Sequence, residues 1–218
     1  LKHGIGEDLR AVIVHGSVVR DDWREGESDI DVIIVLRRSS RAMLEKLTEP
    51  LAIARAAARA EAMILVEDEI DRAADVFPLL YDDVKRHHLV LYGSDPFADL
   101  TVDRKHLRLR IEQELRDLKI RLRRAVIDAG GHKPTLAAVV TRKVRQARFP
   151  LRALLAMLGV PCTDDLEAIL TKAGRKLQVD THSLLRTKEK TEEAIDTLAD
   201  LLASAVRAVD ALEDEVQR

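Results

Sequence analysis

Two short runs of apolar, largely β-branched residues near the start of the chain constrain its fold more than any other feature. They are residues 9–15 (LRAVIVH) and residues 29–36 (DIDVIIVL). Runs of this length and composition are typical of strands in the core of a sheet. The first run ends at the turn pair Gly16-Ser17, and the second begins with Asp29 and Asp31. The chain is therefore predicted to form a sheet with polar groups at the ends of two strands.

The rest of the first half is predicted to alternate between helix and strand. Residues 40–61 are rich in Ala, Leu, Arg and Glu, and they are expected to form a helix that kinks or breaks at Pro50. Further strands are expected over residues 62–66, 76–81 and 89–92. The turn cluster at residues 93–96 (GSDP) ends this half.

The second half of the chain changes to helical periodicity. Apolar residues recur at spacings of three and four, as in Leu107, Ile111 and Leu115. Helices are expected over residues 103–129, 135–158, 164–173 and 184–216. We therefore predict an α+β protein, with a small mixed β-sheet and flanking helices in residues 1–100 followed by an all-α helical bundle domain in residues 101–218.

Composition excludes several classes of protein. The formal net charge is -2, so the chain as a whole is not basic, and nucleic acid would have to bind a local patch. A single cysteine excludes an internal disulfide framework. No apolar run approaches the roughly 18–20 residues that span a bilayer, and no signal peptide is visible. We expect a soluble cytoplasmic protein with no membrane partner.

One local basic cluster stands out in the second predicted helix of the bundle. It consists of Arg142, Lys143, Arg145 and Arg148. Such a cluster either receives the phosphates of a nucleotide or an RNA, or forms a solvated helix face. The pattern leaves both interpretations open.

The acids at the start of the second strand indicate metal chemistry. Asp29 and Asp31 are separated by one residue, which on a strand puts both side chains on the same face. Two neighbouring carboxylates repel each other unless a cation neutralises them. Because hard oxygen ligands favour Mg²⁺ or Mn²⁺, the pair is predicted to hold a divalent metal ion.

Gly16 and Ser17 indicate a phosphate next to that metal. A glycine at a strand end lets a phosphate approach the backbone closely. If a helix begins after Ser17, its free N–H groups face the phosphate, and the serine hydroxyl adds one more donor. Metal ions on the two carboxylates would then bridge a triphosphate and align an attacking hydroxyl.

Taken together, residues 15–36 (HGSVVRDDWREGESDIDVIIVL) resemble the signature of the nucleotidyltransferase superfamily that includes DNA polymerase β. That signature is a Gly-Ser turn followed, about ten residues later, by Asp-x-Asp on a strand, often with a serine just before it. The chain is most similar to the minimal nucleotidyltransferases and the antibiotic nucleotidyltransferases. The likeness covers residues 8–97, and the helical half resembles the carboxy-terminal helical domains of these enzymes in general character.

The resemblance implies a nucleotidyltransferase fold and a set of site residues. Gly16, Ser17 and Ser28 would bind the nucleotide, and Asp29 and Asp31 would be catalytic and hold Mg²⁺ or Mn²⁺. The expected reaction transfers a nucleoside monophosphate from an NTP to an acceptor hydroxyl. The acceptor would be a small molecule, a protein side chain or an RNA end, in a pocket shaped by the helical half.

The chain departs from the family pattern in two places. Relatives commonly have a glycine shortly after the serine, but residues 18–22 (VVRDD) contain none. The resemblance also implies a third carboxylate on a later strand, where this chain has Leu80. Asp82 would lie one pleat further along the same face and is our predicted substitute as a metal ligand. The alternative for Asp82 and Asp83 is a solvated strand end.

Two alternative functions are open, of which these departures motivate the first. The first is a regulatory or antitoxin-like module that binds a metal nucleotide without turning it over. The second is a structural helical adaptor, because the long amphipathic last helix could also join two copies into a homodimer.

Overall fold

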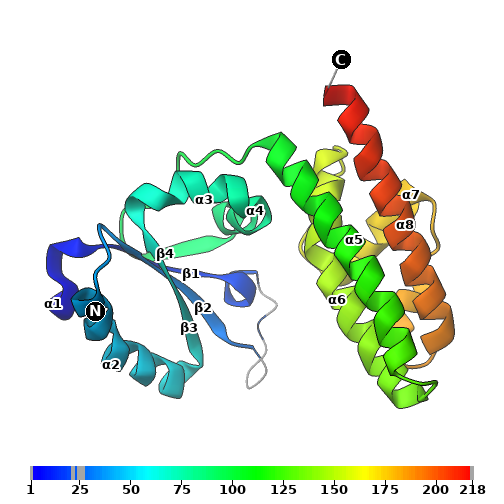
Figure 1. Cartoon of the computed structure of the whole chain (residues 1–218), viewed down its shortest axis with the longest axis horizontal. Helices are drawn as coiled ribbons and strands as arrows, with labels where there is room; N and C mark the ends of the chain where they lie inside the picture. The colour runs from blue at the N-terminus through cyan, green and yellow to red at the C-terminus, as the bar shows by residue number, and fades with distance from the viewer. Residues whose placement is uncertain (1, 21–22, 24–27, 217–218) are drawn as a thin grey trace. The chain divides into compact units, whose positions relative to one another are not determined.

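The computed structural model describes residues 2–20, 23 and 28–216, and the chain forms two compact units. The sheet unit comprises residues 1–103, and the helical unit comprises residues 104–218. Figure 1 shows the strands gathered in the sheet unit and long helices making up the helical unit.

The sheet unit is built on a four-stranded mixed sheet in the described part of the chain, with strand order β3-β2-β1-β4. The strands are β1 (Leu9–His15), β2 (Ile30–Leu36), β3 (Ala60–Val66) and β4 (His88–Gly93). β1 pairs antiparallel with both β2 and β4, whereas β2 and β3 run parallel. The predicted α+β class with a mixed sheet is confirmed.

Helices cover both faces of this sheet (Figure 1). On one face lie the short α1 (Lys2–Ile5) and α2 (Arg41–Ala58), and Leu47 of α2 packs with Ile34 and Leu36 of β2. On the other face lie α3 (Ile70–Val76), α4 (Pro78–Arg86) and the segment after β4. Alternate residues of β2 therefore serve two separate hydrophobic cores.

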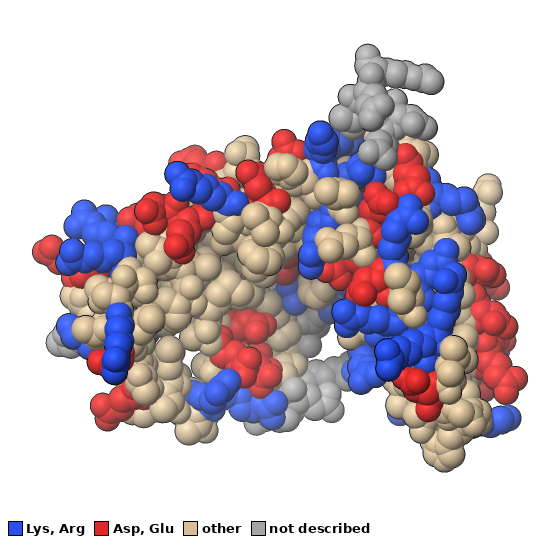
Figure 2. Space-filling model, viewed as in Figure 1, with Lys and Arg blue, Asp and Glu red and all other residues tan. Residues whose placement is uncertain are grey.

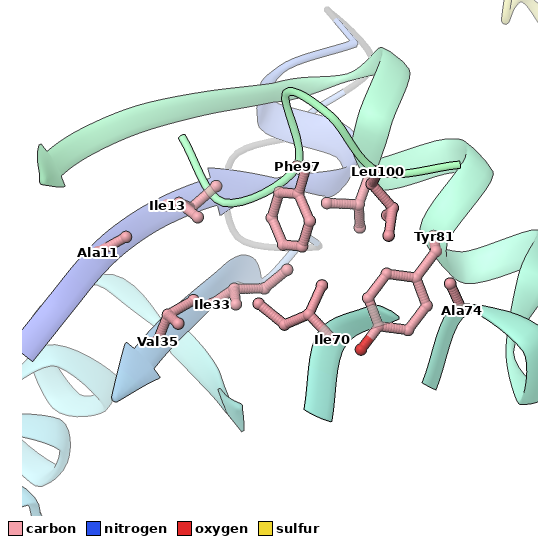
Figure 3. Packing of buried hydrophobic residues seen from close by; sticks show 10 residues of the cluster. Ala11, Ile13, Ile33, Val35, Ile70, Ala74, Tyr81, Phe97 and Leu100 are labelled. Carbon is pink, nitrogen blue, oxygen red and sulfur yellow. The ribbon is translucent and has the colours of Figure 1, made fainter. Parts of the chain in front are cut away.

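The core on the α3/α4 face is shown in Figure 3. Phe97 lies over the strands, between Ile13 of β1 and Tyr81 of α4, and its ring meets the Tyr81 ring edge-on with centroids 6.2 Å apart. Edge-to-face packing of this kind is the favoured arrangement of two aromatic rings. The segment after β4 is thus tied to the sheet, and α4 is held above the β1 and β2 strands.

The predicted strand over residues 76–81 is wrong, because this stretch belongs to α3 and α4. Val76 and Phe77 are exposed, whereas Pro78, Tyr81 and Val84 are buried. That spacing of three is helical, and proline is well tolerated at the first position of a helix. A short apolar run does not by itself distinguish a strand from a buried helix face.

The helix predicted over residues 40–61 is shorter than expected and is not broken. Ser40 caps its start, since its hydroxyl accepts a hydrogen bond from the N–H of Met43 at 3.3 Å. The helix continues through Pro50 and ends at Ala58. Arg59 then takes a left-handed conformation (φ 52°), which reverses the chain into β3.

The helical unit consists of long helices packed by their apolar stripes. They are α5 (Arg104–Asp128), α6 (Lys133–Met157), α7 (Leu166–Leu177) and α8 (Thr191–Val216). Ile111, Leu115 and Leu118 of α5 are buried as the periodicity predicted. The last predicted helix starts too early, because residues 182–186 form a 3₁₀ turn before α8. No helix in the described residues is long and apolar enough to cross a membrane.

Candidate functional site

A row of four titratable side chains crosses one end of the sheet. His88 of β4 pairs with His15 of β1, His15 pairs with Asp31 of β2, and Asp31 pairs with Glu61 of β3. Residues directly opposite on neighbouring strands project to the same face of a sheet. Ile13 and Ile33, two residues along from His15 and Asp31, pack in the core under α3 and α4, so the row lies on that face.

Gly16 brings the turn and the acids together. Its φ of +78° lies in the region that favours glycine, and a Cβ atom there would lie 2.2 Å from Oδ2 of Asp31. The Asp31 carboxylate therefore occupies the space that a side chain at position 16 would need. The two parts of the predicted motif, the Gly16 turn and the Asp31 carboxylate, thus lie next to each other in the structure.

The chain at Ser17 forms a short turn and not the start of the helix that the sequence analysis considered there. Gly16–Val18 form a single 3₁₀ turn, in which the N–H of Val19 bonds to the carbonyl of Gly16 at 3.2 Å. Ser17 and Ser28 are both partly exposed. Asp21 and Asp22 of the segment without glycine lie outside the described residues.

The pKa of Asp31 is raised above its ordinary value. Burial is the main cause that raises its pKa, and the neighbouring Asp29 and Glu61 carboxylates raise it further. His15 and Arg20 act in the opposite direction but do not outweigh burial. His15 has a lowered pKa, first because it is buried, so its imidazole is favoured in the neutral form. Burial thus leaves the negative charge of Asp31 incompletely stabilised.

Glu61 is the acid that the sequence analysis missed. It stands directly opposite Asp31 on the parallel strand β3, and its carboxylate accepts a hydrogen bond from Arg55 at 2.7 Å. The sequence does contain a signal for it. A strand, a helix and a second strand in succession form a parallel pair, so both strands start at the same end of the sheet. The order of these elements therefore indicates that an acid at the start of the third strand lies at the same end of the sheet as Asp31. We call Asp29, Asp31 and Glu61 the acid cluster.

Asp82 is not on a strand, so the geometry behind its prediction as a metal ligand is wrong. It lies on α4 and forms an ion pair with Arg86, one turn along the helix, at 2.9 Å. Leu80 packs against the core. Asp82 as a ligand stays an untested prediction without its original support.

The neighbouring Asp83 is buried in an ion pair. Its Oδ2 atom lies 2.7 Å from Nη1 of Arg20, and both side chains are about nine-tenths buried. Asp83 and Arg20 also act electrostatically on His15. This ion pair ties the chain just after the Gly16 turn to α4, and so holds the turn against the end of the sheet.

The carboxylate oxygens of the acid cluster are suitable ligands for a hard divalent cation, but they do not converge on one point in this structure. The described residues contain no ready-made group of three His, Cys, Asp or Glu side chains around one point. The reason is visible in the ion pairs, because Asp29 accepts from Arg59 at 2.9 Å and Glu61 accepts from Arg55. Figure 2 shows acidic and basic side chains side by side at this end of the sheet unit. Carboxylate oxygens on adjacent strands are a donor set for Mg²⁺ or Mn²⁺.

The basic cluster of the second bundle helix borders a separate groove within the helical unit. This groove has a volume of about 990 Å³ and runs along α5 and α6, where Arg142 and Arg145 line it together with Phe149. Lys143 is buried instead, and burial followed by the nearby Arg142 lowers its pKa. The four residues thus do not share one solvated face.

Comparisons with known proteins show the family of the chain and support its fold. The model of the nucleotidyltransferase domain family matches residues 6–122, more than half of the chain. Among solved structures, the chain is similar to spectinomycin adenyltransferase AAD(9) from Enterococcus faecialis, which was crystallised with ATP and spectinomycin. That match has 12% sequence identity and a TM-score of 0.52, and it covers 95% of this chain and 94% of the other. No curated protein matches the sequence.

Proposed function

This chain belongs to the nucleotidyltransferase domain family, and on that premise we propose that it transfers a nucleoside monophosphate from an NTP to an acceptor hydroxyl by a metal-dependent mechanism. The observation that carries the proposal is the acid cluster, with Asp31 seated against the α-carbon of Gly16. Neighbouring acids next to a glycine turn whose Ser17 is partly exposed would provide a place for a cation and a polyphosphate together.

The reaction follows from the chemistry of these groups. The acceptor oxygen attacks the α-phosphorus, the bond to the β-phosphate breaks, and pyrophosphate leaves. A divalent ion on the acid cluster would neutralise phosphate charge and make the acceptor hydroxyl easier to deprotonate. The Ser17 hydroxyl would donate a hydrogen bond to a phosphate oxygen. We assign Glu61 to the acceptor side, where it receives the proton, because its side chain is 55% exposed and so open to a second substrate.

The structural neighbour guides the choice of substrates to test. That protein was crystallised with ATP and spectinomycin. ATP is therefore the first nucleotide that we propose for this chain, and a small molecule is the first class of acceptor. A protein or an RNA acceptor, a cytoplasmic location and a homodimer remain predictions from the sequence.

The test is nucleotide turnover by the full chain. Labelled ATP, GTP, CTP and UTP are supplied with Mg²⁺ and a panel of small hydroxylated acceptors, and pyrophosphate release is measured. Asp31→Asn is expected to lower the rate about a hundredfold or more, as for other groups that stabilise charge in the transition state. Glu67→Gln is the matched control, because Glu67 is an acid of the same unit that pairs with Arg10 outside the acid cluster. A full rate in Asp31→Asn would refute the proposal.

The alternative function is nucleotide binding without turnover. It is favoured by one observation, namely that arginines occupy two of the three carboxylates in the described residues. The presence of Glu61 opposite Asp31 weighs against it, because the acid set no longer lacks a member. Glu61→Gln separates the two functions. A catalytic site loses pyrophosphate release in this variant while ATP still binds, whereas a binding module shows no release even in the wild type.

A further inference from the structure

Two arginines from the end of α2 hold two of the three carboxylates in the acid cluster. Arg55 Nη2 lies 2.7 Å from Oε1 of Glu61, and Arg59 Nε lies 2.9 Å from Oδ1 of Asp29. Asp31, between them, forms no hydrogen bond or ion pair with another described residue. The two guanidinium groups thus supply positive charge to Glu61 and Asp29, the two acids that act electrostatically on Asp31.

The position of Arg59 is imposed by its backbone. Arg59 is one of two described non-glycine residues with a positive φ, a conformation that costs free energy and is concentrated at functional sites. Its N–H bonds to carbonyls of the last turn of α2, and its carbonyl accepts from the N–H of Ile30 at 3.2 Å. The end of α2 is therefore fastened to the start of β2, and the Arg59 side chain emerges next to Asp29.

Both ion pairs are exposed, which makes them easy to break. The side chains of Arg55 and Arg59 are 70% and 53% exposed, and those of Glu61 and Asp29 are 55% and 45% exposed. Exposed ion pairs contribute little to stability, so each guanidinium can leave by side-chain rotation without any change in the backbone. A divalent cation with a higher charge density competes for the same oxygens.

We propose that Arg55 and Arg59 are positioning residues that act as internal counter-cations, holding Glu61 and Asp29 until a divalent metal ion displaces them. This inference rests on the proposed function, because it takes the acid cluster as the metal site. It explains why three neighbouring carboxylates are stable together without metal, and why they are not assembled around one point in the described residues. Metal affinity is then lower than the carboxylates alone would give.

The test is titration of the metal-free full chain with Mn²⁺ in the absence of nucleotide, with free Mn²⁺ followed by electron paramagnetic resonance. Arg55→Gln and Arg59→Gln are each expected to tighten Mn²⁺ binding about threefold, and the double variant about tenfold, since each removes one competing exposed ion pair. Arg59→Lys keeps the charge and should bind Mn²⁺ like the wild type. Arg41→Gln is the matched control, because Arg41 lies on the first turn of the same helix and pairs only with Glu45 in the described residues.

The outcomes separate this inference from the proposed function. If Asp31→Asn binds Mn²⁺ as the wild type does, the acid cluster is not the metal site and both proposals are wrong. If Asp31→Asn loses binding while the arginine variants bind unchanged or more weakly, the metal site stands and the counter-cation role is overturned. A second readout is the melting temperature of the metal-free protein. It should fall slightly in the double variant, because Asp29 and Glu61 then lose the guanidinium groups that pair with them, and Mn²⁺ should restore it.

Discussion

Glu112 in the helical unit and Asp31 in the sheet unit are both partly buried carboxylates, but their surroundings shift their pKa values in opposite directions. Burial acts to raise the pKa of Glu112, yet hydrogen bonds from Arg116 and Arg108 outweigh burial and lower it. Burial raises the pKa of Asp31, and the neighbouring acids add to the increase. Arginine hydrogen bonds therefore satisfy the charge of Glu112, whereas no hydrogen bond or ion pair within the described residues satisfies that of Asp31.

The same contrast extends to the distribution of charges in each unit. Along α5, acids and arginines pair one turn apart on the surface, in the pairs Arg110–Glu114, Arg116–Glu112, Arg121–Asp117 and Arg124–Asp128. In the sheet unit, acids and histidines gather in one row at one end of the sheet. Pairing along a helix adds a little stability, whereas crowding like charges costs stability and is typical of a functional site.

The largest expected effect concerns the buried ion pair of the sheet unit. Asp83→Ala leaves the Arg20 guanidinium buried without its carboxylate and should cost about 3–5 kcal/mol in the free energy of unfolding. Denaturant unfolding of the full chain measures this cost. Asp117→Ala, which removes an exposed pair with Arg121 in the helical unit, should cost no more than about 0.5 kcal/mol. Equal costs for the two variants would show that burial does not distinguish these two ion pairs in energy.

The next effect concerns the core of the helical unit. Leu115 is fully buried on α5, so Leu115→Ala should cost about 3 kcal/mol through lost burial and the cavity left behind. Leu109→Ala is the control on the same helix, since Leu109 is 56% exposed. Mn²⁺ affinity should be the same in both variants, because the acid cluster belongs to the other unit. A change in Mn²⁺ affinity with Leu115→Ala alone would show that the units are not independent in this respect.

A smaller effect is expected at Glu112, with a defined pH dependence. Its folded-state pKa is lowered, so its contribution is fully present above its ordinary pKa and is lost as pH falls through the folded-state value. Glu112→Gln should therefore lower stability at neutral pH by less than about 1 kcal/mol, because the site is partly exposed to solvent. Urea unfolding at a series of pH values measures the difference, which should shrink in the acid range. A deficit that persisted unchanged in acid would point to lost packing instead.

The smallest expected effect is a stabilisation, and it concerns Asp31. The folded-state pKa of Asp31 is raised, so its charge destabilises the metal-free protein above that value, and this cost disappears as pH falls toward its ordinary pKa. Asp31→Asn should raise the melting temperature at neutral pH by about 1–2 °C, less than a full kcal/mol would produce. Differential scanning calorimetry without metal measures the change. A lower melting temperature would mean that Asp31 is satisfied in the metal-free state.

Elements and motifs that depend on local patterns could be predicted from the sequence. The β-branched run of β1 and the helical periodicity around Leu115 were readable because strand and helix repeats are short. The Gly16-Ser17 turn and the pair Asp29 and Asp31 were readable for the same reason, since the chemistry of each lies within three residues. α4 was misread because its apolar residues are too few to show which repeat they follow.

Which of these groups lie next to one another depends on tertiary packing and could not be predicted from the sequence. Glu61 faces Asp31 because β3 runs parallel to β2 in one register, and a register between strands 30 residues apart is not encoded in either strand alone. Arg59 reaches Asp29 because α2 ends at Ala58, three residues earlier than the composition predicted, and because Arg59 itself takes the left-handed conformation. Long-range pairing and the exact end of a helix both depend on packing, because each is chosen by the burial it allows across the whole sheet.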